Sequence, residues 1–411
     1  MIIKDVICAA GQSGGFNRDR VAIKAGAVAD GATYIGKPMQ PGYRQIVQPG
    51  TTVLIQLRLE DGQVAMGDCV DVIAGGIQGR DPLFIAADHL GWMKEELPRL
   101  LKGRDISRFK AHAEEIDQHR REGKPLHTAV RYGLTQALLS AASLANHEPM
   151  ACTIAREYGS TLAKKPVPIL ASSGTHDHAA LDRIILKKAD ILPHSSFYVV
   201  KTDVGFKGEI LLAYAKRVAT RIKEIGEEGY RPTIHLDCYG TIGELFNNDL
   251  EKIGNYFGEI REAVGGLELM IEAPIIMKTR DKQIDIYRQL CGVIKRQGHG
   301  TQAIVDEWCN TLQDVIDFTD AGAGHLLQVK MPDLGGINNA IEATLYARRK
   351  GMGISLGGSL NETDLTSRVS AHVALAAQPS YLFAKPGSGG DLGFMIQTNE
   401  MVRTLALVGQ E

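Results

Sequence analysis

The sequence lacks the features that mark membrane proteins and nucleic-acid-binding proteins. None of its 411 residues lies in a run of about 18 apolar residues, the length that a membrane-spanning helix needs. The chain also has no block of about five or six basic residues, and its 46 Lys and Arg nearly balance its 48 Asp and Glu, which leaves a net charge of −2. We therefore expect neither a membrane nor a nucleic acid as a partner.

Cysteine pairs and nucleotide motifs are missing as well. The six cysteines show no CxxC spacing, which argues against a zinc-thiolate site and against a disulfide framework. No Walker motif or dinucleotide fingerprint occurs, and no signal-peptide pattern opens the chain. What is present is an ordinary globular composition, 44% hydrophobic and 23% charged. These features predict a cytoplasmic protein with a sizeable core.

The first 160 residues predict an α+β domain. Two alternating apolar runs in residues 51–70 are joined by Asp61-Gly62, which is a strong hairpin signal, so residues 1–70 are expected to form a small antiparallel sheet. Residues 81–157 then show apolar positions near a 3.6-residue period, as helices do. Strands followed by helices in separate blocks are typical of the α+β class.

The remaining chain, residues 161–411, predicts a (β/α)₈ barrel. Short apolar runs alternate there with amphipathic helical segments that often end in glycine. The eight expected strands are residues 167–171, 189–194, 232–237, 267–272, 301–306, 325–330, 352–357 and 380–385. Eight strand–helix units in this length fit the barrel fold.

The second barrel strand has an alternative. The segment FYVVKTD at 197–203 also has the composition of a strand, and it would replace residues 189–194 in the barrel. Spacing favours the earlier segment, which ends at His194, whereas the later one would place Lys201 near the strand end.

Three acidic residues close successive strands of the predicted barrel. Asp237, Glu272 and Asp306 each end an apolar run and are one strand–helix unit apart, so their carboxylates should converge at the barrel mouth. Converging carboxylates repel one another unless a cation lies between them, and hard oxygen ligands suit Mg²⁺. The alternative is that each acid merely caps the following helix. Three acids in equal spacing favour the metal site.

Candidate bases stand on two other strands. Gln328 and Lys330 share one face of the sixth strand and should both point into the mouth. A lysine next to a divalent cation gives up its proton more readily, which suits a general base, although it could instead only balance the acids. His194 closes the second strand and would face Lys330 across the mouth, or be a loop residue beside Pro193.

Two further features compete with this interpretation or add to it. His176 and His178 follow the first barrel strand, and an HxH there resembles metal-dependent amidohydrolases. Apart from His235, however, the later strand ends supply acids and lysine rather than histidines. The glycine-rich segment 356–364 follows the seventh strand, where Ser359 and the amide of Leu360 could contact a carboxylate.

The local strings around these residues resemble the methylaspartate ammonia-lyase family of the enolase superfamily. That superfamily pairs a capping α+β domain with a (β/α)₈ barrel. The strings, which run along the whole chain, are GGFNRDR, ILPH, HLDCYGTIG, IEAP, VDEWCNT, QVKMPDLGG, LGGSLNETD and AKPGSGGDLG. Such long strings are far more specific than one short motif.

The resemblance implies a reaction and a role for each candidate. Ammonia would be lost from 3-methylaspartate to give mesaconate, with Mg²⁺ held by the three strand-end acids. Lys330 would take the C3 proton of the L-threo substrate, His194 would serve the opposite C3 configuration, and Gln328 would bind a substrate carboxylate. The family is also associated with homodimers and with activation by K⁺.

The sequence departs from the family pattern around the expected substrate. Ser172 replaces a glutamine, and Ser359-Leu360 replaces Thr-Cys. Leu170, Ser355 and Phe383 stand where phenylalanine, tyrosine and leucine are usual. The substrate is therefore less certain than the reaction type. Two alternatives remain at this point, namely a lyase, dehydratase or racemase of a related amino or hydroxy acid, and a barrel that binds metal and carboxylate without turnover.

Overall fold

A three-stranded antiparallel sheet opens the chain in the computed structural model, which describes residues 1–73 and 75–409. The strands lie in the order β1–β4–β5, with bounds Ile3–Arg18, Val47–Leu59 and Val64–Cys69. The predicted hairpin is confirmed, because β4 and β5 pair on either side of Gly62. Gly62 has a φ of +90°, a conformation that glycine adopts without steric cost.

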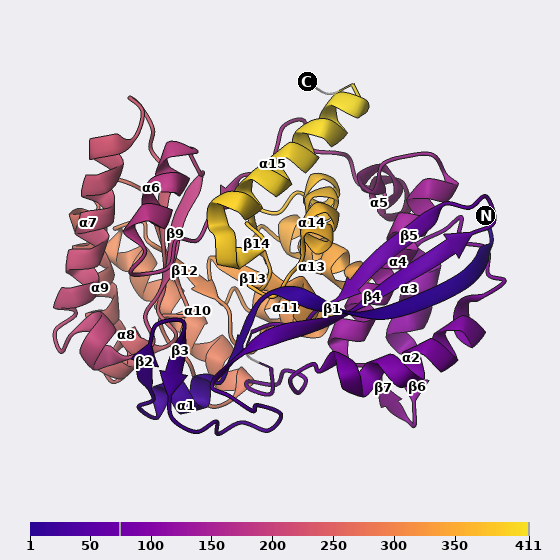
Figure 1. The fold of residues 1–411 in the computed structure, drawn as a ribbon. Coiled ribbons are helices and arrows are strands. Elements are labelled where there is room, and N and C mark those ends of the chain that lie inside the picture. Colours follow the sequence, from indigo (N-terminus) through magenta and orange to yellow (C-terminus); the bar gives the residue numbers. More distant parts are fainter. Residues whose placement is uncertain (74, 410–411) are drawn as a thin grey trace.

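Helices cover one face of this sheet, as the 3.6-residue pattern predicted (Figure 1). Their bounds are Ala86–Leu101 for α2, Lys110–Gln118 for α3, Thr128–Ala145 for α4 and Met150–Tyr158 for α5. A short ribbon of β6 (Arg120–Arg121) and β7 (Lys124–Pro125) separates α3 from α4. Two glycines let α4 approach β5 closely, since a Cβ on Gly67 would lie 2.1 Å from the Gly133 carbonyl oxygen.

The chain between β1 and β4 leaves the sheet and lies against the barrel (Figure 1). This excursion contains α1 (Arg20–Lys24) and the two-stranded ribbon of β2 (Val28–Asp30) and β3 (Thr33–Ile35). Asp19 caps α1 and also accepts a hydrogen bond from the Gln40 backbone at 2.9 Å. The Lys24 ammonium donates to the Tyr239 carbonyl at 3.0 Å, which ties the excursion to the barrel.

Eight parallel strands form the closed barrel that the sequence predicted. Their bounds are Ile169–Leu170 (β8), Ile191–Ser196 (β9), Thr233–Asp237 (β10), Leu269–Glu272 (β11), Gln302–Val305 (β12), Leu326–Lys330 (β13), Gly353–Gly357 (β14) and Tyr381–Phe383 (β15). Seven of these lie inside the predicted ranges, and β9 overlaps its range but ends two residues later.

Helices surround the barrel. Those after the first five strands are α6 (His178–Leu186), α7 (Glu209–Ile225), α8 (Thr241–Leu245), α9 (Leu250–Ala263), α10 (Arg280–Gln297) and α11 (Leu312–Asp320). The rest are α12 (Met331–Leu334), α13 (Ile337–Arg349), α14 (Asp364–Ala377), the 3₁₀ turn η2 (Gly387–Gly389) and α15 (Gly390–Leu407).

The choice of second strand is settled in favour of the segment that holds His194. β9 pairs with β10 on one side and with β8 on the other. The alternative strand at 197–203 is wrong, because Val200–Val204 form a short π-helix, η1, outside the barrel sheet. Lys201 therefore lies in a helical turn and does not end a barrel strand.

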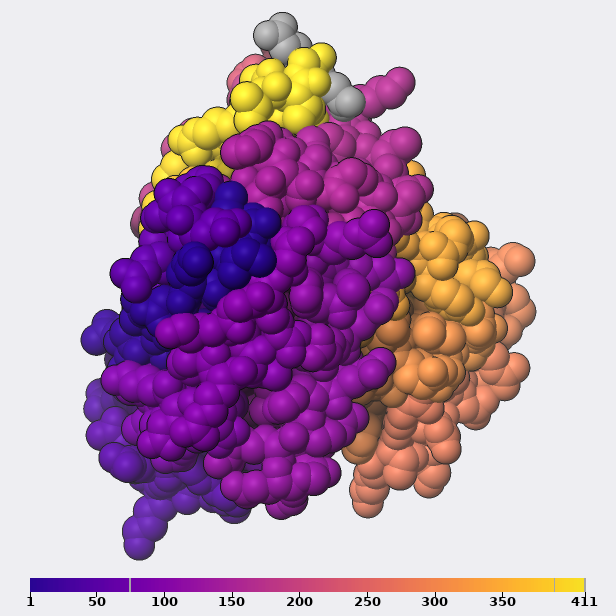
Figure 2. Space-filling model, turned by 90° about the vertical axis from the view of Figure 1, so that its right-hand side faces the viewer, coloured from indigo at the N-terminus to yellow at the C-terminus, as the bar shows by residue number. Residues whose placement is uncertain are grey.

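The N-terminal sheet and helices pack directly on the barrel. Helix α4 contacts α12 and α13, and α5 contacts α14. In Figure 2 the N-terminal residues cover most of one face, with orange barrel segments at its edge. The division at 160/161 stays a prediction, and positions 410–411 of the predicted barrel domain lie outside the described residues. None of the helices in the described chain is long and apolar enough to cross a membrane.

Candidate active site

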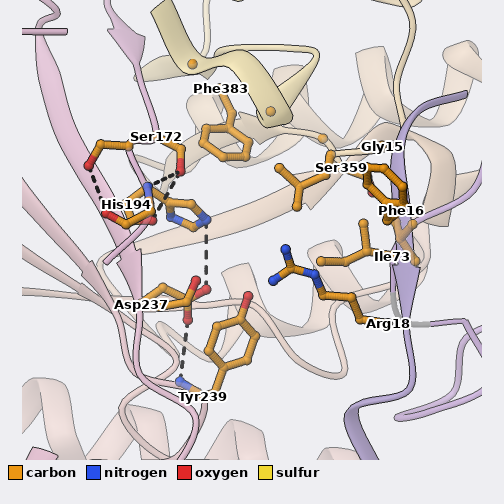
Figure 3. A pocket seen from close by; sticks show the side chains of 18 of the residues that line it. Gly15, Phe16, Arg18, Ile73, Ser172, His194, Asp237, Tyr239, Ser359 and Phe383 are labelled. Atoms are coloured by element: carbon orange, nitrogen blue, oxygen red, sulfur yellow. Dashed lines mark hydrogen bonds and ion pairs between the residues drawn. The ribbon is translucent and has the colours of Figure 1, made fainter. Parts of the chain in front are cut away.

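A cavity of about 350 Å³ lies at the carboxyl ends of the barrel strands (Figure 3). The barrel forms its floor, and the end of β1 with the segment before α2 forms its opposite side. Every site residue that the sequence nominated lines this cavity, namely Asp237, Glu272, Asp306, Lys330, His194, Gln328, Ser172, Ser359 and Leu360. The structure thus brings together residues from seven barrel strands or the loops that follow them.

The three acids are neighbours at the ends of consecutive strands. Asp237 and Glu272 are direct partners in the register of β10 and β11, and Asp306 follows the last residue of β12. All three side chains are almost fully buried, with exposed fractions of 1–2%. Ala273 comes directly after Glu272 with a φ of +45°, a left-handed conformation that turns the chain sharply away.

Burial and mutual repulsion disturb the ionisation of these acids. Burial, followed by the charges of Glu272 and Asp306, raises the pKa of Asp237 well above its usual range. Burial, followed by the charge of Asp306, raises the pKa of Glu272 to about 8. Burial opposes ionisation of Asp306 too, but the Lys330 and Arg80 cations outweigh it and lower the pKa of that carboxyl. A cation among the three acids would let all of them ionise.

The donor atoms fit a hard divalent cation. Asp237 Oδ2 and Glu272 Oε2 are buried and have no hydrogen-bond partner among the described residues. Unsatisfied buried carboxylate oxygens are costly, so a ligand for them is expected. Carboxylate oxygens are the donors that Mg²⁺ prefers, with water and substrate completing its coordination.

A second donor set shares Glu272. The possible ligand atoms of His194, His235 and Glu272 lie within 4.8 Å of one another. Glu272 Oε2 is 3.7 Å from His194 Nδ1 and 3.1 Å from His235 Nε2. Two imidazoles and one carboxylate would suit zinc or another transition metal better than Mg²⁺. The two sets share the Glu272 carboxylate.

Lys330 and Gln328 point from β13 into the cavity. The Lys330 ammonium donates a hydrogen bond to Asp306 Oδ1. Gln328 is buried, and its Oε1 has no hydrogen-bond partner in the described chain. Gly357 on β14 leaves room for this amide, because a Cβ there would lie 2.6 Å from Gln328 Cδ. Both predicted side chains therefore line the cavity, Lys330 paired with Asp306 and Gln328 with an unpaired oxygen in the described chain.

His194 enters the cavity through an irregularity in β9. Its φ is +46°, and the pairing of β9 with β10 shifts register at this residue. The centroid of its ring lies 4.5 Å from that of the Phe383 ring, in an edge-on arrangement. Its Nε2 lies 3.9 Å from Asp237 Oδ2 (Figure 3). Burial, aided by His235 and the Lys330 cation, lowers the pKa of His194 well below its usual value, so the imidazole is neutral.

The HxH segment lies apart from the acids. His176 and His178 are exposed, and Asp177 between them caps α6 by accepting a hydrogen bond from the Ala180 amide at 2.8 Å. The amidohydrolase alternative therefore has no geometric support. His235 is close to Glu272 but does not line the cavity.

The departures from the family pattern divide into two groups. Ser172, Ser359, Leu360 and Phe383 line the cavity, so they shape the space for a bound molecule. Leu170 and Ser355 are buried in the barrel interior and do not reach the cavity. Only the first group can contact a substrate directly.

The sequence reasoning missed the cationic side chains from the N-terminal part of the chain. Arg20 donates to Tyr239 Oη at 3.1 Å and is 3.4 Å from Glu307. Arg80 is 2.6 Å from Glu307 and 2.8 Å from Asp333. Arg18 also lines the cavity. For Arg18 and Arg20 the only signal was their place in the string GGFNRDR, which does not include Arg80.

The capped barrel, with acids at three successive strand ends and bases beside them, defines an enolase-type enzyme. Residues 1–159 match the family described as "Methylaspartate ammonia-lyase N-terminus", and residues 161–410 match the family described as "Methylaspartate ammonia-lyase C-terminus". The chain is 45% identical over 410 residues to methylaspartate ammonia-lyase 1 of Carboxydothermus hydrogenoformans, covering 99% of this chain and 97% of the relative. The chain belongs to the methylaspartate ammonia-lyase family.

Solved structures agree with this assignment. Methylaspartate ammonia lyase from Citrobacter amalonaticus, solved with (2S,3S)-3-methylaspartic acid, is 41% identical with a TM-score of 0.96 over 100% of both chains. A Mg complex of β-methylaspartase from Clostridium tetanomorphum is 42% identical with a TM-score of 0.94, also over 100% of both. Muconate lactonizing enzyme from Pseudomonas fluorescens, at 17% identity and a TM-score of 0.63 over 95% of this chain and 88% of its own, shares the fold.

Proposed function

We propose that this protein is a Mg²⁺-dependent carbon–nitrogen lyase that removes ammonia reversibly from L-threo-3-methylaspartate to give mesaconate. The observation that carries the proposal is the convergence of three buried acids with Lys330 and His194 in one cavity. The names of the relatives support the same reaction.

Asp237, Glu272 and Asp306 would hold the metal ion. Two of them present buried oxygens without partners, which is the donor chemistry that Mg²⁺ takes. When bound, Mg²⁺ stabilises the negative charge that develops on the substrate carboxylate beside C3. The Mg complex of the Clostridium tetanomorphum relative supports this choice over the set that includes His194 and His235.

Lys330 and His194 would handle the C3 proton. In the unprotonated form, Lys330 Nζ takes this proton from the L-threo substrate, the electron pair forms the C2–C3 double bond, and the C2–N bond breaks with its electrons on nitrogen. The neutral ring of His194, which projects from β9 rather than β13, serves substrates of the opposite C3 configuration. Asp306 holds the lysine in place through its hydrogen bond.

Gln328, Ser172, Ser359 and Leu360 would bind the substrate. The Gln328 amide has an unsatisfied oxygen beside the floor acids, where a substrate group can pair with it. Ser172 Oγ donates only a long hydrogen bond, 3.4 Å, to the His194 carbonyl and can turn to a ligand. The Ser359 amide already donates to Glu362, so its hydroxyl is the group left for the substrate.

The remaining expectations follow from the same proposal. We propose activation by K⁺, a homodimeric assembly and a cytoplasmic location, in keeping with the family resemblance. Size-exclusion chromatography with light scattering tests the dimer, and replacing K⁺ by Na⁺ in the assay tests the monovalent-ion dependence.

The decisive assay follows the conjugated double bond of the product by ultraviolet absorbance. Purified protein with L-threo-3-methylaspartate and Mg²⁺ should form mesaconate and release ammonia in equal amounts, and excess EDTA should stop the reaction. Absence of product while Mg²⁺ binds would contradict the substrate, and product formation unaffected by EDTA would contradict the metal.

A related substrate is the second candidate, favoured by Ser172, Leu360 and Phe383 in the cavity wall. A panel of aspartate derivatives that differ at C3, together with the matching 2-hydroxy acids, separates the two. The best kcat/KM on 3-methylaspartate excludes this alternative, and a better value on another member establishes it.

A further inference from the structure

Arg18 is a cation that lines the cavity and has no ion-pair partner among the residues that the structure describes. It is the last residue of β1, and its amide donates to the Ile73 carbonyl at 3.0 Å. Tyr43 Oη donates to the Arg18 carbonyl at 3.2 Å, so the backbone is fixed on both sides. Figure 3 shows its guanidinium extending from β1 toward the centre of the cavity. A cation whose backbone is fixed in this way is suited to bind an anion.

The side chain of Arg18 makes no hydrogen bond or ion pair within residues 1–73 and 75–409, and its Nε is buried without an acceptor. The other arginines that line the cavity all have carboxylate partners: Arg20 with Glu307, Arg80 with Glu307 and Asp333, and Arg183 with Asp391. Leaving the buried Nε of a half-buried arginine unpaired is costly, so an occupant that accepts from this guanidinium is expected.

The charges around the cavity lead to the same conclusion. Lys330 and one divalent cation would balance the three acids at the strand ends. Arg20 and Arg80 are balanced by their two acidic partners on the barrel loops. Among the arginines that line the cavity, Arg18 is then the one without a carboxylate partner within the described residues. A substrate carboxylate would supply that partner.

We propose that Arg18 binds the substrate carboxylate that is remote from the metal, the one on the amino-bearing carbon. The inference rests on the proposed function and specifies its substrate class as amino dicarboxylates with this carboxylate free. A guanidinium matches a carboxylate with two parallel hydrogen bonds, which gives orientation as well as affinity. Phe16 and Ile73 flank Arg18 with apolar surface, which strengthens a charged contact by excluding water.

The test couples a change in the enzyme to a change in the substrate. Wild type and Arg18→Gln are assayed with L-threo-3-methylaspartate and with its 1-amide, in which this carboxylate is neutral. Charged hydrogen bonds contribute enough that Arg18→Gln should lower kcat/KM for the diacid by about 10- to 100-fold, mainly through KM. The amide should be a poor substrate of the wild type and should be hardly affected by the substitution.

Arg44→Gln serves as the matched control, because Arg44 is exposed in the same N-terminal segment. Both variants should unfold at the wild-type temperature, since neither side chain is part of a described ion pair. Unequal losses for diacid and amide in Arg18→Gln support the proposal. Equal losses for the two substrates, or no loss, overturn it.

A binding experiment separates this inference from the proposed reaction. Calorimetric titration of the Mg²⁺-loaded protein with mesaconate and with its monoamide at the same carboxyl needs no turnover. If the wild type turns over neither substrate, the reaction is wrong, yet tighter binding of mesaconate that disappears in Arg18→Gln still supports the carboxylate site. Equal binding of both compounds to wild type overturns the site even if the lyase reaction is found.

Discussion

The floor and the rim of the cavity are built differently. The floor consists of residues that end consecutive barrel strands, namely Asp237, Glu272, Asp306, Gln328 and Lys330. The rim consists of residues from β1, from the segment before α2, from the loop after β14 and from the end of β15, namely Phe16, Arg18, Ile73, Leu360 and Phe383. In the floor, one pattern recurs along the chain, a strand that ends in a polar residue, and these residues include groups for proton transfer. The rim follows no repeat and holds the groups that contact the rest of a substrate.

The largest expected effect comes from the base on the floor. Lys330→Ala removes the group that would take the C3 proton, and general bases contribute about 10²- to 10⁴-fold. We expect kcat for L-threo-3-methylaspartate to fall by this factor while Mg²⁺ binding is retained. Steady-state kinetics measures it, with Lys282→Ala, an exposed lysine on α10, as the control. Normal turnover by Lys330→Ala would show that Lys330 is not the base.

The second-largest expected effect concerns a buried ion pair that supports the loop after β14. Lys385 and Glu362 form a fully buried ion pair at 3.1 Å, and Glu362 accepts from the Ser359 amide and from Tyr132 Oη. Lys385→Met leaves a buried carboxylate unpaired, which should destabilise the protein by about 3–5 kcal/mol. Urea unfolding measures this value. Glu362→Gln added to the same chain should recover part of the loss, and full stability of the single variant would show that the pair is unimportant.

A pH-dependent effect belongs to the rim as well. Burial raises the pKa of Asp71 from 3.8 to about 7, although Phe84 and Asn361 donate to its carboxylate. The folded state therefore holds this proton more tightly than the unfolded chain does, so the stability that this group contributes is fully present below about pH 4 and is lost as the pH rises to 7. At about 1.4 kcal/mol per pKa unit the loss amounts to roughly 4 kcal/mol.

Asp71→Asn should remove this decline. The unfolding midpoint in urea, compared at pH 5 and pH 8, should change less in the variant than in the wild type. An unchanged difference between the two pH values would assign the decline to other groups.

The smallest of these effects concerns the metal. Asp237→Asn keeps the shape of the side chain but removes one anionic donor from the floor, and even the loss of outer partners of metal ligands costs about 10- to 100-fold in affinity. We expect Mg²⁺ affinity to fall by about 100-fold and the Mg²⁺-induced rise in unfolding temperature to shrink. Asp364→Asn, outside the cavity, is the control. Unchanged Mg²⁺ binding would move the site toward His194 and His235.

The sequence predicted the floor because its signals are local. An apolar run that ends in an acid, repeated every strand–helix unit, gives both the strand and the direction of the side chain, as at Glu272. The closed barrel and the N-terminal hairpin at Asp61-Gly62 were predictable for the same reason. The left-handed turn at Ala273 was not predictable, because alanine has no local preference for this conformation.

The N-terminal part of the rim could not be predicted because its residues reach the cavity only through tertiary packing. The excursion between β1 and β4 has weak internal periodicity and is held by contacts such as that of Lys24 with the Tyr239 carbonyl. Arg18 carries no motif of its own, and its importance follows from the lack of a partner in three dimensions. The roles of Leu170 and Ser355 were also invisible, since alternation alone does not say how far a side chain lies from the mouth.

The path of β1 has a consequence for synthesis. The ribosome releases Arg18, Arg20 and Arg80 long before any of the floor acids, and the N-terminal sheet with its four helices can assemble meanwhile. Glu307 and Asp333 therefore meet these cations only after the barrel segments have been synthesised. A nascent chain therefore gains its affinity for an anionic ligand only at the end of translation, so that ligand cannot assist the early steps of folding.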